Sequence, residues 1–294
     1  MKPTAPTGLT YSRDRDHLLE DGFVVAKGLL APSLITALRD MSLDLLSQQA
    51  PQHFERFAHH GSMVPLDYGV SRAAKLIGNE GLLAYLRGLG FPHPKWLSGY
   101  VISKPPNSAG LWWHQDWWAW GDPLTRRRIP AQIACLVYLD RTTPRNGCLR
   151  VIPGSHRVLH PLLQELPDAH GEDIEALADS SSAHRLRPDE TDVPTEIGDV
   201  VLCDVRLLHA THPNASEARR SCIDLWYLPD FDELPPRFQA HYVQHPCLPK
   251  PGWWKTGASR ALPEKLKELF PRYEGLPQPP IHFTRRPSTE DRRT

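Results

Sequence analysis

The amino-acid sequence lacks the features that would place a protein in a membrane or on a nucleic acid. It contains no apolar run of the roughly 18 residues that a transmembrane helix needs, and residues 1–22 lack the apolar core of a secretory signal. The 34 Lys and Arg balance the 34 Asp and Glu, so a formal net charge of zero gives no reason to expect an anionic partner surface. We therefore expect a cytoplasmic protein without a nucleic-acid or membrane partner, and the sequence leaves the oligomeric state open.

Cysteine is also scarce, whereas proline is unusually common. The five cysteines are scattered without a CxxC pair, which argues against a structural zinc site. An odd number of cysteines in an intracellular chain is typical of free and mostly buried thiols. The 30 prolines, in a chain without Gly-Ser low complexity, predict many ordered turns rather than disorder.

The length of 294 residues and the 40% apolar composition suit a single large domain. Apolar residues from Leu34 to Leu46 recur at helical spacing and predict an amphipathic helix that begins near Pro32. Residues 81–89 predict a second helix. We expect a flexible tail at 1–15 and one domain at 16–294. The domain would have a helical part at about 16–95 and a β core at about 96–230, which contains a loop or lid excursion at 161–192. A C-terminal extension at about 231–294 would follow, with a short helix at 263–270.

Short β-type runs, separated by Pro, Gly and Asn, dominate the middle of the chain. Several short strands with turn signals between them are typical of a sandwich or barrel, so we expect a mainly β fold with flanking helices (α+β). The predicted strands are Trp96–Ser103, Leu111–Gln115, Gln132–Leu139, Cys148–Ile152, Asp199–Cys203, Arg206–Ala210 and Ser221–Leu228.

The sharpest chemical feature is the segment WWHQDWW at residues 112–118. In a strand, positions i and i+2 face the same side, so His114 and Asp116 would direct an imidazole and a carboxylate to one point. A further His from a neighbouring strand would complete a set of two imidazoles and one carboxylate. That set suits Fe(II) and leaves positions open for a bidentate 2-oxoacid and O2. The HxD motif by itself is weak evidence, because short motifs recur by chance.

A second segment, residues 198–227, supplies candidates for the third ligand and for an anion-binding residue. It contains His209 and His212, followed by Arg219 and Arg220. Arg can hold a carboxylate through two parallel hydrogen bonds. Either histidine could instead be a loop residue, but the combination of HxD, a distant His and then Arg favours a joint site.

The order and identity of six segments make the chain resemble the phytanoyl-CoA dioxygenase family of Fe(II)- and 2-oxoglutarate-dependent enzymes. The resemblance covers about Asp16 to Pro229 and implies a double-stranded β-helix, that is, a jelly-roll or cupin-like core. The segments are LLEDGFVVAKGLL, ISKPPNSAG, WWHQD, PRNGCLRVIPGSH, IGDVVLCD and HATHPNASEARRS.

The resemblance also implies roles for individual residues. In the family the distal metal His precedes an Asn by five residues and the 2-oxoglutarate Arg by eleven, which selects His209 and Arg220 and makes His114, Asp116 and His209 the catalytic metal ligands. If residues 221–228 form a strand, its alternation also separates Arg220 from Arg219.

Three more residues are implied at the co-substrate, 2-oxoglutarate. Lys104 in ISKPP and Thr211, two residues after the distal His, match family residues that reach it. Gln132 is a further candidate, because it would face inward from a strand, although a plain polar residue at a strand start explains it equally well.

For the aromatic residues around the motif, core packing is the default. Trp113, Trp117 and Trp118 are nevertheless candidates for lining the substrate pocket, because binding sites favour aromatic walls.

The implied function is hydroxylation, or another oxidation, of a small-molecule metabolite with O2, yielding succinate and CO2. Halogenating relatives have a small residue in place of the metal carboxylate, so Asp116 favours hydroxylation. Two alternatives stay open: a zinc hydrolase on a cupin-like barrel, since two histidines and a carboxylate also hold zinc, and a non-catalytic small-molecule-binding barrel. The identity of the primary substrate is not readable from the sequence.

Overall fold

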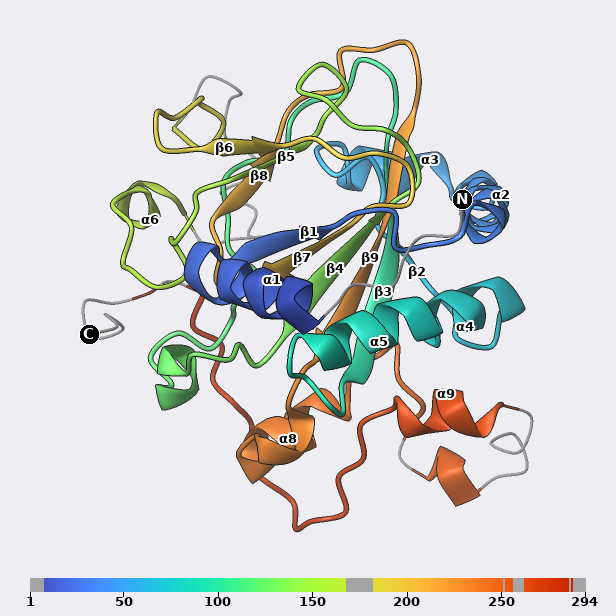
Figure 1. Ribbon diagram of the computed structural model, residues 1–294, viewed down its shortest axis with the longest axis vertical. Coiled ribbons are helices and arrows are strands. Elements are labelled where there is room, and N and C mark those ends of the chain that lie inside the picture. Colours follow the sequence, from blue (N-terminus) through green and yellow to red (C-terminus); the bar gives the residue numbers. More distant parts are fainter. Residues whose placement is uncertain (1–7, 168–181, 251, 256–261, 286, 288–294) are drawn as a thin grey trace.

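A computed structural model describes residues 8–167, 182–250, 252–255, 262–285 and 287 (Figure 1). Its centre is formed by two antiparallel sheets, one of six strands and one of three. The larger sheet has the order β1 (Phe23–Ala26), β7 (Val200–Asp204), β4 (Ile133–Tyr138), β9 (Arg220–Leu228), β3 (Lys95–Lys104) and β2 (Val64–Pro65), and the smaller has the order β6 (Thr191–Val193), β5 (Leu149–Val151) and β8 (His209–Thr211).

Helices cover the outer face of the larger sheet, where α1 and α5 lie in front of the strands in Figure 1. The helices are α1 (Gly8–Asp21), α2 (Pro32–Ser47), α3 (Pro51–Arg56), α4 (Ser71–Ile77), α5 (Glu80–Gly88), α6 (Leu162–Glu165), α8 (Pro236–Tyr242) and α9 (Glu264–Glu268), with 3-10 turns at Pro123–Arg126, Phe231–Glu233 and Trp253–Lys255. One apolar cluster joins most of these helices to the larger sheet, whereas α6 belongs to a second cluster beside the smaller sheet. Among the described residues, no helix combines the length and apolar character needed to cross a bilayer.

The helices predicted near Pro32–Leu46, at 81–89 and at 263–270 are present as α2, α5 and α9. Helix α2 begins at Pro32 and buries Leu38 completely, and the Asn79 side chain caps α5 by accepting a hydrogen bond from the backbone N–H of Leu82. The expected tail over residues 1–15 is wrong from Gly8 onward, because α1 begins there. Its Asp14 accepts a 2.7 Å hydrogen bond from Tyr85 of α5, which ties this helix to the domain.

Most predicted strands are confirmed with shifts of one or two residues, but two are wrong. Residues 111–115 form an extended segment that pairs with β8 only through a single β-bridge, between His114 and His209. Residues 205–208 form a turn, and β8 begins only at His209. Strand β6 was not predicted and lies partly within the expected excursion at 161–192, of which residues 168–181 lie outside the described part. The described flanks of that excursion pack on the Leu111–Trp113 segment.

A buried ion pair holds the turn between β7 and β8. Arg206 and Asp204 are each 2% exposed, and their Nη2 and Oδ2 atoms are 2.5 Å apart. Arg206 Nη1 also donates to the backbone carbonyls of Thr125 and Arg127, both at 2.8 Å. The side chain of Gln115 donates to the Arg206 carbonyl. The turn that leads to His209 is thereby tied to the segment that carries His114 and Asp116.

We expect the substitution Arg206→Met to destabilise the protein by about 3–5 kcal/mol, because it leaves the Asp204 carboxylate buried without its partner. Arg141→Met is the matched control, since the Arg141–Glu196 pair is 67% and 66% exposed and should contribute less than about 1 kcal/mol. Denaturant unfolding of both variants measures the difference. Equal losses would contradict a structural role for the buried pair.

Candidate active site

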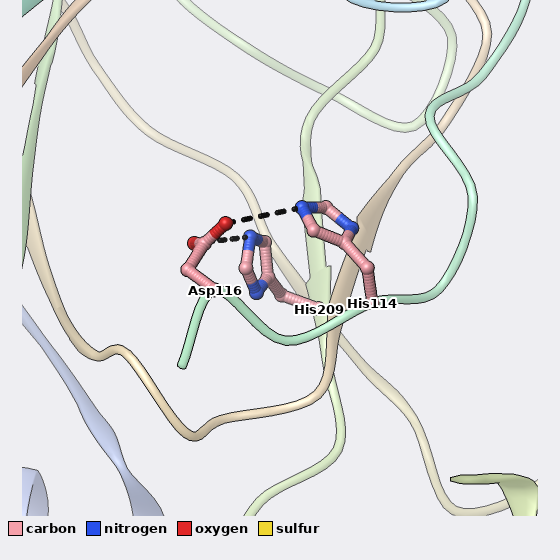
Figure 2. A group of neighbouring side chains, drawn as sticks. All are labelled: His114, Asp116 and His209. Atoms are coloured by element: carbon pink, nitrogen blue, oxygen red, sulfur yellow. Dashed lines mark ion pairs between the residues drawn. The ribbon is translucent and has the colours of Figure 1, made fainter. Parts of the chain in front are cut away.

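Two histidines face each other across a short backbone bridge. His114 lies on the extended segment after β3, and His209 is the first residue of β8. Each donates its backbone N–H to the carbonyl of the other, and both N–O distances are 3.0 Å. The ring centroids are 4.1 Å apart. Figure 2 shows the Asp116 carboxylate next to both rings, and the ligand atoms of the three residues lie within 4.8 Å of one another.

Hydrogen bonds to the backbone orient both imidazoles. Nδ1 of His114 lies 2.9 Å from the carbonyl oxygen of Trp112, and Nδ1 of His209 lies 3.0 Å from that of Leu207. A carbonyl can only accept, so each Nδ1 carries the proton and each Nε2 is the basic nitrogen. Both Nε2 atoms point to Asp116, at 3.7 and 3.4 Å from its oxygens (Figure 2). Such carbonyl-bound histidines are typical of metal ligands.

Asp116 is positioned by the turn after β7. Its backbone N–H and that of Trp117 both donate to the carbonyl of Val205, at 2.9 and 3.0 Å. The Asp204–Arg206 pair anchors this same turn. Two nitrogens and one carboxylate oxygen on one side of the cluster form the donor set that suits Fe(II) with coordination positions left open.

The three side chains line a cavity of about 310 Å³. Lys104, Thr211 and Arg220, the residues implied for the co-substrate, line the same cavity. Its apolar lining includes Phe57, Met63, Ile102, Leu111, Leu136 and Leu149. The volume is at the lower end of the range for small-molecule sites, which is roughly 300–1,000 Å³.

Lys104 and Arg220 form a cationic end of the cavity. Lys104 is 1% exposed and Arg220 is 2% exposed. Burial, and then the neighbouring Arg220 guanidinium, lower the pKa of the Lys104 ammonium well below its usual range. Arg220 donates to the Gly147 carbonyl at 2.6 Å, while its Nε is buried without a partner among the described residues. Two buried cations side by side, one of them incompletely paired, suit an anionic ligand between them.

Gly147 and Asn214 support this cationic end. A Cβ on Gly147, whose φ is +87°, would lie 3.3 Å from Lys104 and 3.4 Å from Arg220, so glycine leaves room beside both cations. Asn214 is fully buried and donates to the carbonyls of Lys104 and Pro105. The resemblance to the family, in which an Asn follows the distal His by five residues, indicated Asn214, whereas nothing in the sequence placed Gly147 at the site.

Gln132 and the three tryptophans lie elsewhere. Gln132 is near Tyr242 of α8, 3.4 Å from its hydroxyl. Trp113 belongs to a small core cluster beside the smaller sheet, Trp117 is in the main core, and Trp118 packs against it. None of these four is among the described residues that line the cavity. The structure therefore gives the tryptophans a packing role and does not support contact with a substrate.

The other histidine of the second segment has a different partner. His212 Nε2 lies 2.6 Å from Asp192 Oδ1, and with Cys148 these residues form a separate group on the smaller sheet. The sequence also gave no signal for Asp224 and Arg285, which line the cavity. Asp224 comes from β9, and Arg285 comes from the C-terminal extension.

Comparison with known proteins identifies curated relatives that share part of this chain. A probable alpha-ketoglutarate-dependent hypophosphite dioxygenase of Stutzerimonas stutzeri is 33% identical over 125 residues, which are 42% of this chain and 41% of that protein. An ectoine dioxygenase of Sphingopyxis alaskensis is 32% identical over 131 residues, 40% of either chain. The match thus spans about two fifths of the length of these relatives.

Solved structures share the fold. HygX from Streptomyces hygroscopicus, with nickel and 2-oxoglutarate bound, has a TM-score of 0.58 at 22% identity, over 77% of this chain and 88% of that one. The epimerase SnoN, in complex with Fe3+, alpha ketoglutarate and nogalamycin RO, has a TM-score of 0.54 at 16% identity, over 76% and 84%. The two sheets therefore form a double-stranded β-helix. The phytanoyl-CoA dioxygenase (PhyH) family model matches residues 18–222, more than half of the sequence, and the chain belongs to that family.

Proposed function

We propose that this protein is an Fe(II)- and 2-oxoglutarate-dependent dioxygenase that oxidises a small-molecule metabolite. The observation that carries the proposal is the shared cavity, onto which His114, Asp116 and His209 open together with Lys104 and Arg220. To chelate the metal, 2-oxoglutarate must reach it while its remote carboxylate is held elsewhere. The metal site and the anion site must therefore share one cavity. The curated relatives that match part of the chain are named as dioxygenases, which supports the same chemistry.

The chain's own residues divide the work of binding between them. His114, Asp116 and His209 would hold the iron, and their fixed Nδ1 hydrogen bonds keep the ligand atoms together. Arg220 would pair with the remote carboxylate of 2-oxoglutarate, with Lys104 and Thr211 beside it. When bound, the iron supplies the oxidation chemistry with O2, in which 2-oxoglutarate is converted to succinate and CO2.

Shielding from water is the other task of the protein. The apolar lining of the cavity excludes solvent from the reacting atoms and strengthens the electrostatic contacts of the buried cations. Asp116 keeps a carboxylate in the metal cluster, which favours hydroxylation or a related oxidation over halogenation. The relatives named for hypophosphite and ectoine support a small-molecule substrate.

A zinc hydrolase has less support. The donor set would also hold zinc, but a hydrolase needs no buried Arg and Lys aimed at a second anion. Because both cations line the metal cavity, a site for a diacid co-substrate explains residues that hydrolysis leaves without a role. A non-catalytic barrel likewise leaves the intact donor set unexplained.

Loss of a metal ligand should abolish turnover. Anaerobic Fe(II) and 2-oxoglutarate should give the wild-type protein a visible charge-transfer band, and succinate should form once O2 is admitted. We expect Asp116→Ala to reduce both the band and succinate formation. The reduction should exceed the roughly 10- to 100-fold loss that is typical when a residue that only positions a metal ligand is replaced. His212→Ala is the control, because His212 pairs with Asp192 outside the metal cluster. Succinate formation with Zn(II) in place of Fe(II) would contradict the oxygenase.

The neighbouring arginines provide a matched test of co-substrate binding. Arg220→Met should raise the KM for 2-oxoglutarate by roughly 30-fold or more, since truncating a buried charge partner costs about 2 kcal/mol or more. Arg219 donates to the Ser103 carbonyl and does not line the described cavity, so Arg219→Met should change KM by less than about threefold. Steady-state succinate formation measures both. A similar KM for the two variants would rule out the assigned role of Arg220.

A further inference from the structure

Asp224 lies in a part of the cavity that the residues for 2-oxoglutarate do not occupy. It follows Arg220 by four positions on β9, so the two side chains face the same side of the sheet. Both line the cavity, as do Cys222 and Trp226 on the same face. At roughly 3.3 Å per residue, Asp224 is about 13 Å along the strand from Arg220. The strand thus carries a carboxyl group to a part of the cavity remote from the cationic pair.

The protein leaves the carboxyl of Asp224 incompletely paired. Trp226 donates a hydrogen bond to it, but Oδ1 is buried and has no partner among the described residues. Burial, and then the neighbouring Asp116 carboxylate, raise the pKa of this carboxyl well above its usual range. An unpaired buried polar atom destabilises a fold, so such atoms are rare at positions with a purely structural role.

We propose that Asp224 binds the primary substrate by accepting a hydrogen bond from one of its hydroxyl or ammonium groups. The inference rests on the proposed dioxygenase function, because it assigns to the primary substrate the part of the cavity that iron and 2-oxoglutarate would leave free. The missing partner of Oδ1 then comes from the substrate, and the position of Asp224 near Asp116 brings the bound group close to the metal cluster. The substrate class is therefore a polar metabolite with a hydrogen-bond donor rather than a bare acyl chain.

Paired probe compounds test this assignment. Small alcohols and primary amines of metabolite size are compared with their O-methyl and N-acetyl counterparts, by stimulated 2-oxoglutarate decarboxylation in the Fe(II)-loaded enzyme. The donor-bearing members should stimulate turnover and the capped members should not. Asp224→Leu should lower kcat/KM for a stimulating compound by roughly 10- to 100-fold, the scale of an unmade hydrogen bond to a buried group. Asp224→Asn should keep more of the wild-type kcat/KM for alcohols than for amines. The amide oxygen of Asn accepts a hydrogen bond, but it cannot supply a negative charge to an ammonium group.

The controls separate this proposal from the dioxygenase function itself. Substrate-free succinate formation and the KM for 2-oxoglutarate should stay within about threefold of wild type in both Asp224 variants, because Arg220 and the metal cluster are intact. Equal stimulation by capped and uncapped compounds, unchanged kinetics of Asp224→Leu, or no stimulating compound in the whole set would each overturn the role of Asp224. A wild-type enzyme without substrate-free turnover would instead refute the dioxygenase.

The C-terminal extension makes an independent contribution to the same cavity. Its last described part, red in Figure 1, runs back to the segment that follows the metal motif. Thr284 donates to the carbonyl of Trp118 at 2.8 Å and accepts from the N–H of Trp120 at 3.0 Å. The ring of Phe283 lies 5.0 Å from that of Trp118. This backbone pairing holds Arg285, the next residue, where it lines the cavity.

Arg285 faces a cavity that already has cations for 2-oxoglutarate. Arg56, at the end of α3, lines the cavity as well. Both guanidiniums are exposed, unlike the buried Lys104 and Arg220, so they belong to the mouth of the cavity. We infer that Arg285 binds an anionic group of the primary substrate, a carboxylate or phosphate, at this mouth.

The test compares the kinetic effects of substitutions at two positions of the C-terminal extension, Arg285 and His282. In the probe set, carboxylates and phosphates are matched with their methyl esters. Arg285→Gln should raise the KM for stimulating anionic compounds by about threefold to tenfold, the range for an exposed charged hydrogen bond, and leave the esters unchanged. His282→Gln is the control, because His282 is exposed on the same segment but does not line this cavity.

Three outcomes would contradict the assignment of Arg285. The first is an equal effect on the anionic compounds and their esters, and the second is a set in which no anionic compound stimulates turnover. The third is a raised KM for 2-oxoglutarate in Arg285→Gln, which would assign the guanidinium to the co-substrate instead. Unchanged substrate-free turnover in the variant keeps these outcomes separate from a failure of the dioxygenase.

Discussion

The site depends on one backbone bridge, the reciprocal pair of hydrogen bonds between His114 and His209. These two residues are 95 positions apart in the sequence and belong to segments that share no longer ladder. Direct cross-strand neighbours have their side chains on the same face, so the bridge alone brings the imidazoles within 4.1 Å. The turn held by Asp204 and Arg206 then adds Asp116. The three ligands are therefore preorganised, so metal binding would require little rearrangement of the protein.

Strand β9 gives the cavity its length and its polarity. Alternate residues from Arg220 to Trp226 line the cavity, so one strand supplies both the guanidinium proposed to bind the co-substrate and the carboxyl proposed to bind the primary substrate. The guanidinium and the carboxyl lie about 13 Å apart along the same strand face, which separates the two proposed ligands in space. The low dielectric of the lining strengthens both contacts.

The family match ends at residue 222, but the cavity does not. Asp224 and Arg285 both lie beyond it, and Arg285 comes from a tail that pairs with the residues after the metal motif. The His114–Asp116–His209 cluster and the residues proposed for the co-substrate therefore lie within the shared part of the fold. The residues assigned here to substrate selection come from the part that follows. This division allows the specificity of the cavity to change without altering the geometry of the metal cluster.

The local pattern of the sequence was sufficient for helices α2, α5 and α9, for most strands, for the HxD pair and, with the family spacing, for His209 and Arg220. It did not predict helices α3, α4, α6 and α8. Periodicity and motif offsets are local properties, and they carry over because burial and strand alternation follow from them. The choice between cavity and core for Trp113, Trp117 and Trp118 was not local, because none of them lies in a strand and their packing depends on which distant residues surround them. The convergence of Asp224 and Arg285 on the metal cavity required the tertiary structure, because the pairing of Thr284 with Trp118 and Trp120 leaves no periodic signal in either segment.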